Sequence, residues 1–115
     1  MKTTIYHNPR CSKSRNALAL LKERDMEVEI VEYLKAPPSE QELDGILTKL
    51  GMEPRDLMRR KEKPYKEKGL DNPALDRAAL IRAMVENPIL IERPIVLVDN
   101  KVALGRPIDR IVEIL

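Results

Sequence analysis

The segment YHNPRCSKSRN, residues 6–16, contains the only cysteine of the chain, Cys11, and its only histidine, His7. A strand-like run precedes the segment and a helix-like run follows it, so we expect Cys11 where a strand gives way to a helix. Helix N–H groups and nearby cations can lower a thiol pKa from about 8.5 to about 3.5–7.5. A buried, inert cysteine is the alternative, but the polar residues on both sides of Cys11 favour a reactive thiol.

Three thiol chemistries compete, and the spacing of the residues argues against two of them. A dithiol oxidoreductase needs Cys-x-x-Cys, whereas CSKS has Ser14 in place of the second cysteine. A cysteine phosphatase loop needs an arginine six residues after the cysteine, where this chain has Ala17. What remains is a single thiol above a helix N-terminus, acting on an oxyanion that arginines from elsewhere in the chain could hold.

Candidate arginines flank other predicted elements. Arg93 and Arg106 lie at the two ends of a predicted hairpin, and Arg59 and Arg60 lie near the middle of the chain. The planar guanidinium group suits a tetrahedral oxyanion better than an ammonium group does. These arginines are therefore candidates for anion binding, with a solvated surface charge as the alternative for each.

The elements that must position these residues follow the order of an α/β domain. A capping box at Ser39 and Glu42 starts one helix, and Gly51 is placed to end it. The expected elements are, in order, a strand at 3–7, a helix from Ser12, a strand at 27–33, a helix at 39–50, a short basic helix near 54–61, a helix at 74–87, a β-hairpin turning at Asp99–Asn100 and a last helix beginning near Pro107. This order favours a mixed four-stranded sheet.

The thioredoxin-like fold has the same order, with a helical insertion between its βαβ half and its ββα half. We therefore expect an α/β protein with one domain over residues 1–115 and an insertion at about 39–92. The chain has 43% hydrophobic and 35% charged residues and a net charge of +2, which is an ordinary globular composition.

Composition also bears on location and partners. The chain has no run of about 18 apolar residues, and its N-terminal stretch has no apolar core of a secretory signal. A single cysteine fits a reducing compartment, so we expect a cytoplasmic protein without membrane partners. The basic stretch at 55–68 is interrupted by acidic residues and offers one tyrosine for stacking, which argues against nucleic acid. One cysteine and one histidine do not make a metal site.

Five segments (IYHNPRCSKSRN, EYLKAPPS, LMRRKEKPYKEKGL, NPILIERPIV and GRP) resemble the glutaredoxin-linked arsenate reductase family, the ArsC-like proteins of the thioredoxin-like superfamily, in this order and at this spacing. The resemblance covers essentially the whole chain and implies that Cys11 is the nucleophile. It maps the family's three oxyanion-binding arginines onto Arg59, Arg93 and Arg106. Arg59 is preferred over Arg60 because it directly follows the Leu-Met pair.

The resemblance also implies positioning roles around the cysteine. The family's loop residues that lower the pKa of the cysteine and position it correspond to His7, Asn8, Ser14 and Arg15. Pro94 corresponds to the cis-proline that faces the active cysteine in thioredoxin-like folds.

A single cysteine would need an outside thiol to complete a reduction. Converting As(V) to As(III) takes two electrons, and one thiol supplies only one of the two sulfurs of a disulfide. The resemblance implies glutathione as co-substrate, glutaredoxin as protein partner, arsenate or a similar oxyanion as substrate, and no bound cofactor. Two alternatives stay open: a glutathione-dependent monothiol oxidoreductase acting on another substrate, and a non-enzymatic redox regulator that binds RNA polymerase.

Overall fold

The computed structural model describes residues 2–115, and they form two compact units. The first unit contains the residues up to Ala36 together with Arg93–Leu115, and the second contains Pro37–Glu92. None of the helices in the described part of the chain has the length and apolar character that crossing a membrane requires.

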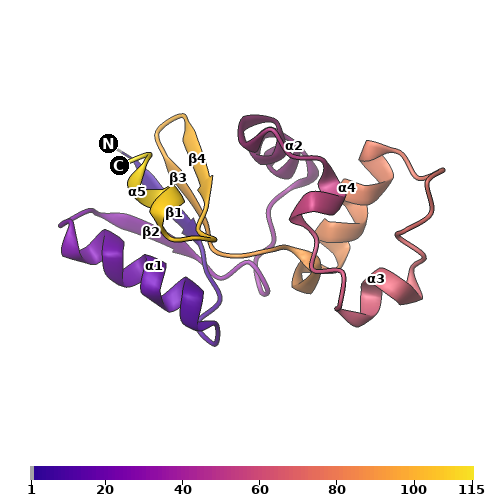
Figure 1. The fold of residues 1–115 in the computed structure, drawn as a ribbon, viewed down its shortest axis with the longest axis horizontal. Helices are drawn as coiled ribbons and strands as arrows, with labels where there is room; N and C mark the ends of the chain where they lie inside the picture. Colours follow the sequence, from indigo (N-terminus) through magenta and orange to yellow (C-terminus); the bar gives the residue numbers. More distant parts are fainter. Residues whose placement is uncertain (1) are drawn as a thin grey trace. The chain divides into compact units, whose positions relative to one another are not determined.

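The first unit is built on a mixed four-stranded sheet with the strand order β2-β1-β3-β4 (Figure 1). Its strands are β1 (Thr3–Tyr6), β2 (Val28–Val31), β3 (Ile95–Val98) and β4 (Lys101–Leu104). β1 pairs in parallel with β2 and antiparallel with β3, and β3 pairs antiparallel with β4. The expected mixed four-stranded α/β sheet is confirmed, and the β1–β3 pairing joins segments from the two ends of the chain.

Helices α1 (Ser12–Glu23) and α5 (Asp109–Val112) pack on the same face of this sheet. Ala17 and Leu21, one turn apart on α1, are fully buried, as is Ile111 of α5. They share one apolar cluster with sheet residues, namely Ile5, Val96, Val98 and Ala103. The cluster therefore fixes both helices relative to the strand ends that carry the candidate site residues of this unit.

The second unit is helical, and its elements are α2 (Glu40–Leu50), η1 (Pro54–Leu57), α3 (Lys63–Glu67), α4 (Arg77–Glu86) and η2 (Pro88–Leu90). The predicted capping box starts α2: Glu42 N–H donates to Ser39 Oγ at 3.0 Å, and Ser39 N–H donates to Glu42 Oε1 at 2.9 Å. Gly51 ends α2 in the left-handed conformation, with φ of 67°. The predicted start and end of this helix are therefore confirmed.

The expected basic helix near 54–61 is wrong in extent. A 3₁₀ turn ends at Leu57, and Met58 is extended and forms an antiparallel bridge with Ile91. Arg59 N–H donates to the carbonyl of Leu90 at 2.7 Å, so the backbone here bonds across to another segment rather than along a helix.

Candidate active site

Asn8 holds the backbone between β1 and α1 in a compact turn. Its carbonyl accepts a hydrogen bond from Cys11 N–H at 3.0 Å, and its Oδ1 accepts a hydrogen bond from Arg10 N–H, also at 3.0 Å. Its own N–H donates to Ser14 Oγ at 3.0 Å. Arg15 braces the same turn because its Nη1 donates to the carbonyl of Pro9 at 3.0 Å. Asn8, Ser14 and Arg15 thus shape the loop that presents Cys11.

Cys11 is the N-cap residue of α1, with an extended backbone and a half-buried side chain. Burial by itself raises the pKa of its thiol. The N–H groups of Ser14 and Lys13, together with hydrogen bonding and positive charge from Arg93, outweigh burial and lower the pKa of Cys11 below its ordinary value. The first turn of α1 holds no acidic side chain to oppose this effect. The geometry thus favours a thiolate at the helix N-terminus.

A second arginine reaches the same sulfur from the other end of the chain. Arg106 Nη2 lies 3.6 Å from Cys11 Sγ, and Arg106 Nε donates to the carbonyl of Arg93 at 2.6 Å. The Arg93–Pro94 peptide bond is cis. The structure therefore brings Arg93 and Arg106 together at Cys11, both half-buried and both carried by segments that flank the β3–β4 hairpin.

Gly105 contributes to the site through its size, a role that sequence reasoning did not assign. A Cβ at this position would lie 2.7 Å from Ile111 Cδ1 and 2.8 Å from Pro94 Cγ. Gly105 N–H also donates to the carbonyl of Pro94 at 2.8 Å. Only glycine lets the end of β4 approach Pro94 this closely. The segment GRP, residues 105–107, was the sequence signal for this position.

His7 is buried and forms a 2.6 Å hydrogen bond between its Nδ1 and Ser14 Oγ. Burial is the main cause that lowers the pKa of His7; Glu32 opposes the shift, while Lys22 and Arg15 add to it. The lowered pKa of His7 therefore favours the neutral ring at pH 7. A neutral Nδ1 can accept a hydrogen bond from the Ser14 hydroxyl group. The same hydroxyl oxygen then accepts a hydrogen bond from Asn8 N–H.

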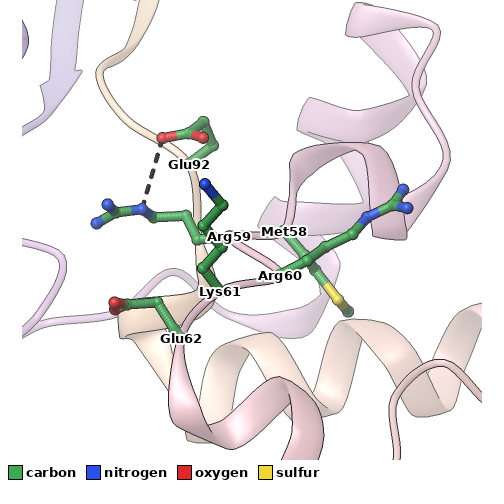
Figure 2. A pocket seen from close by; sticks show the side chains of 6 residues that line it. All are labelled: Met58, Arg59, Arg60, Lys61, Glu62 and Glu92. Atoms are coloured by element: carbon green, nitrogen blue, oxygen red, sulfur yellow. Dashed lines mark ion pairs between the residues drawn. The ribbon is translucent and has the colours of Figure 1, made fainter.

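Arg59 belongs to the second unit, where it lines a cavity of about 350 Å³ (Figure 2). The cavity is bordered by Met58, Arg59, Arg60, Lys61, Glu62 and Glu92. Arg59 Nε lies 3.8 Å from Glu92 Oε1. Arg60 is engaged elsewhere: its Nε donates to the carbonyl of Arg55 at 3.3 Å, and its Nη2 lies 3.7 Å from Asp56 Oδ1. Over residues 2–115 there is no group of three acidic, histidine or cysteine side chains that could hold a metal.

Comparison with known proteins identifies close relatives along the whole chain. The sequence profile of the ArsC family matches residues 6–114. The chain is 54% identical over 112 residues to an arsenate reductase of Neisseria meningitidis, covering 96% of each chain. It is 52% identical over 111 residues to the uncharacterised Escherichia coli protein YfgD, covering 96% of this chain and 93% of the relative. The solved structure of an arsenate reductase from Vibrio cholerae is similar with a TM-score of 0.95 and 46% identity, covering 100% of this chain and 98% of that one.

Proposed function

This chain belongs to the ArsC family, and from that membership we propose that it is an enzyme that reduces arsenate to arsenite with Cys11 as nucleophile. The observation that carries the proposal is the Cys11 sulfur at the N-terminus of α1, with Arg106 Nη2 at 3.6 Å and Arg93 lowering its pKa. A thiolate and a bound oxyanion both require positive charge at this point.

Arsenate is a tetrahedral oxyanion, and guanidinium groups suit its oxygens. In our proposal Arg93 and Arg106 hold it above the sulfur, and Arg59 supplies a third guanidinium. Their charge offsets the repulsion between an anionic nucleophile and an anionic substrate, and it stabilises the charge that builds on the arsenate oxygens during attack.

In the first chemical step the Cys11 thiolate attacks arsenic. A sulfur–arsenic bond forms, and one arsenate oxygen leaves as water after taking up protons from solvent. Arsenic remains As(V) in this adduct. His7, Asn8 and Ser14 act by holding the loop that presents the sulfur, and they take no part in bond making.

The two electrons come from outside thiols. Glutathione displaces a second oxygen from arsenic as water, giving arsenic bonded to two sulfurs. The thiolate of glutaredoxin then attacks the glutathione sulfur; a disulfide forms between them, and the electron pair of the broken sulfur–arsenic bond reduces arsenic to As(III). Hydrolysis of the remaining bond to Cys11 releases arsenite and restores the thiol. This chemistry needs free thiols, which fits the expected cytoplasmic location.

The test is arsenate-dependent oxidation of NADPH in a mixture with glutathione, glutaredoxin and glutathione reductase. We expect activity with the native chain and none with Cys11→Ser, since a serine hydroxyl is not ionised at neutral pH. Equal rates for the two proteins would refute the proposal. Deglutathionylation measured without arsenate separates this function from that of a general monothiol oxidoreductase.

A further inference from the structure

Arg59 and Glu92 meet in the wall of the cavity of the second unit (Figure 2). Arg59 Nε lies 3.8 Å from Glu92 Oε1, and the two side chains are only 30% and 25% exposed. A half-buried pair is less screened than the ion pairs on the surface of this unit, such as Arg82 with Glu40, whose side chains are 61% and 51% exposed. The charge of Glu92 therefore acts on the Arg59 guanidinium group with less screening than a surface carboxylate would have.

The backbone fixes the points from which the two side chains leave. Met58 and Ile91 form an antiparallel bridge and are both buried. Two hydrogen bonds flank this bridge. Arg59 N–H donates to the carbonyl of Leu90 at 2.7 Å, and Glu92 N–H donates to the carbonyl of Leu57 at 2.8 Å. Arg59 and Glu92 thus belong to one hydrogen-bonded ladder rather than to two independent loops.

The pair uses only one edge of the guanidinium group. Glu92 approaches Nε, and in Figure 2 the two terminal nitrogens of Arg59 point away from the Glu92 carboxylate. Among the described residues, the Arg59 side chain has no second partner that would occupy these nitrogens. The carboxylate beside Nε thus leaves both Nη groups of Arg59 able to form charge-assisted hydrogen bonds to a second anion.

We propose that Glu92 is a positioning residue for Arg59, holding its guanidinium so that both Nη groups face the oxyanion. The inference rests on the proposed function of Arg59. Without Glu92, Arg59 would sample more rotamers, and the substrate would have to order it on binding. The Michaelis constant for arsenate should then rise by about two- to tenfold, the range expected for ordering one long side chain.

The variants Glu92→Ala and Glu92→Gln test this directly. At 3.8 Å the contact is an ion pair rather than a hydrogen bond, so the isosteric Gln should raise KM as Ala does. In an Arg59→Ala background, Glu92→Ala should raise KM by a smaller factor than it does in the native chain, because the part of its effect that passes through Arg59 is already lost. Glu40→Gln is the matched control: its Oε1 lies 3.7 Å from Arg82 Nε in the same unit, and its KM should be native.

The outcomes separate this inference from the function on which it rests. A native chain that reduces no arsenate refutes the proposed function. If the native chain is active, an unchanged or lowered KM in both Glu92 variants overturns the positioning role. It is also overturned if Glu92→Ala raises KM by the same factor in the Arg59→Ala background as in the native chain. Protection of Cys11 from iodoacetamide by arsenate gives the same comparison for binding alone, and urea unfolding midpoints identify any variant that is merely unstable.

Discussion

The Cys11 sulfur is held between opposing influences. Partial burial disfavours its ionised form, whereas two helix N–H groups and Arg93 favour it, and Arg106 Nη2 lies 3.6 Å away. The two arginines are not independent, since Arg106 Nε donates to the carbonyl of Arg93 at 2.6 Å. A charge removed from either position should therefore change the acidity of the thiol.

We expect Arg93→Ala and Arg106→Ala each to shift the alkylation of Cys11 by iodoacetamide to higher pH. Loss of a cation destabilises the thiolate, so the pKa of Cys11 rises and the rate at pH 7 falls several-fold. The measurement is the alkylation rate from pH 5 to pH 10, followed by intact mass. Arg110→Ala, on an exposed residue paired with Glu113 at 3.7 Å, serves as the control. A native pH profile in both arginine variants would contradict this account of the thiol.

At the scale of elements, the end of β4 is the critical junction. Gly105 N–H donates to Pro94, and the space for a side chain is taken by Pro94 and Ile111. Arg106 follows directly, so its placement at Cys11 depends on how closely β4 approaches the segment before β3. The close approach is a property of packed elements, and one missing methyl group makes it possible.

Gly105→Ala should therefore destabilise the protein by about 1–3 kcal/mol, the usual cost of overpacking. The displaced Arg106 should also slow alkylation of Cys11 at pH 7. Urea unfolding and the alkylation rate check the two effects. Gly45→Ala is the opposite control: no atom lies within 4 Å of its added Cβ in the interior of α2, so we expect a gain of about 0.5–1 kcal/mol. Equal stability of the two variants would be inconsistent with this packing.

At the scale of the whole molecule, the chain divides into the sheet unit and the helical unit at Pro37 and Arg93. Each unit is small, and a chain of such a size buries little surface by itself. We therefore expect residues 1–115 to unfold as one domain, in a single transition.

Tyrosine fluorescence can test this cooperativity. Tyr65 is the only tyrosine of the second unit, so in Tyr65→Phe the fluorescence reports Tyr6 and Tyr33 of the first unit alone. Far-UV circular dichroism follows the helices of both units. The two urea transitions of Tyr65→Phe should coincide, and two separated midpoints would show that the units unfold independently.

Features encoded by neighbouring residues could be predicted from the sequence. Ser39, Glu42 and Gly51 define α2 because caps depend on residues three or four positions apart. The contact of Arg106 with Cys11 could not be derived in this way, because the two residues are 95 positions apart and meet only through the β1–β3 pairing. The resemblance to a known family predicted that Arg106 and Cys11 belong to one site, but it gave no distance or orientation between them.

In the basic segment near 54–61, the local sequence pattern predicted a helix that the structure does not contain over its full length. Its composition suits a helix, but the bridge of Met58 with Ile91 overrides that local preference. The ladder that results also places Glu92 beside Arg59, a relation between positions 33 residues apart that periodicity does not contain.

Cys11 is the only cysteine in the chain, and its environment favours the reactive thiolate. No internal partner exists for an oxidised Cys11, so any disulfide it forms must join the protein to a second molecule. Disulfide-activated resin would then retain the chain through its reactive centre and release it with a reductant, while protein already oxidised at that sulfur would flow through. The same property gives one fluorophore or one mass tag per chain without any engineered residue.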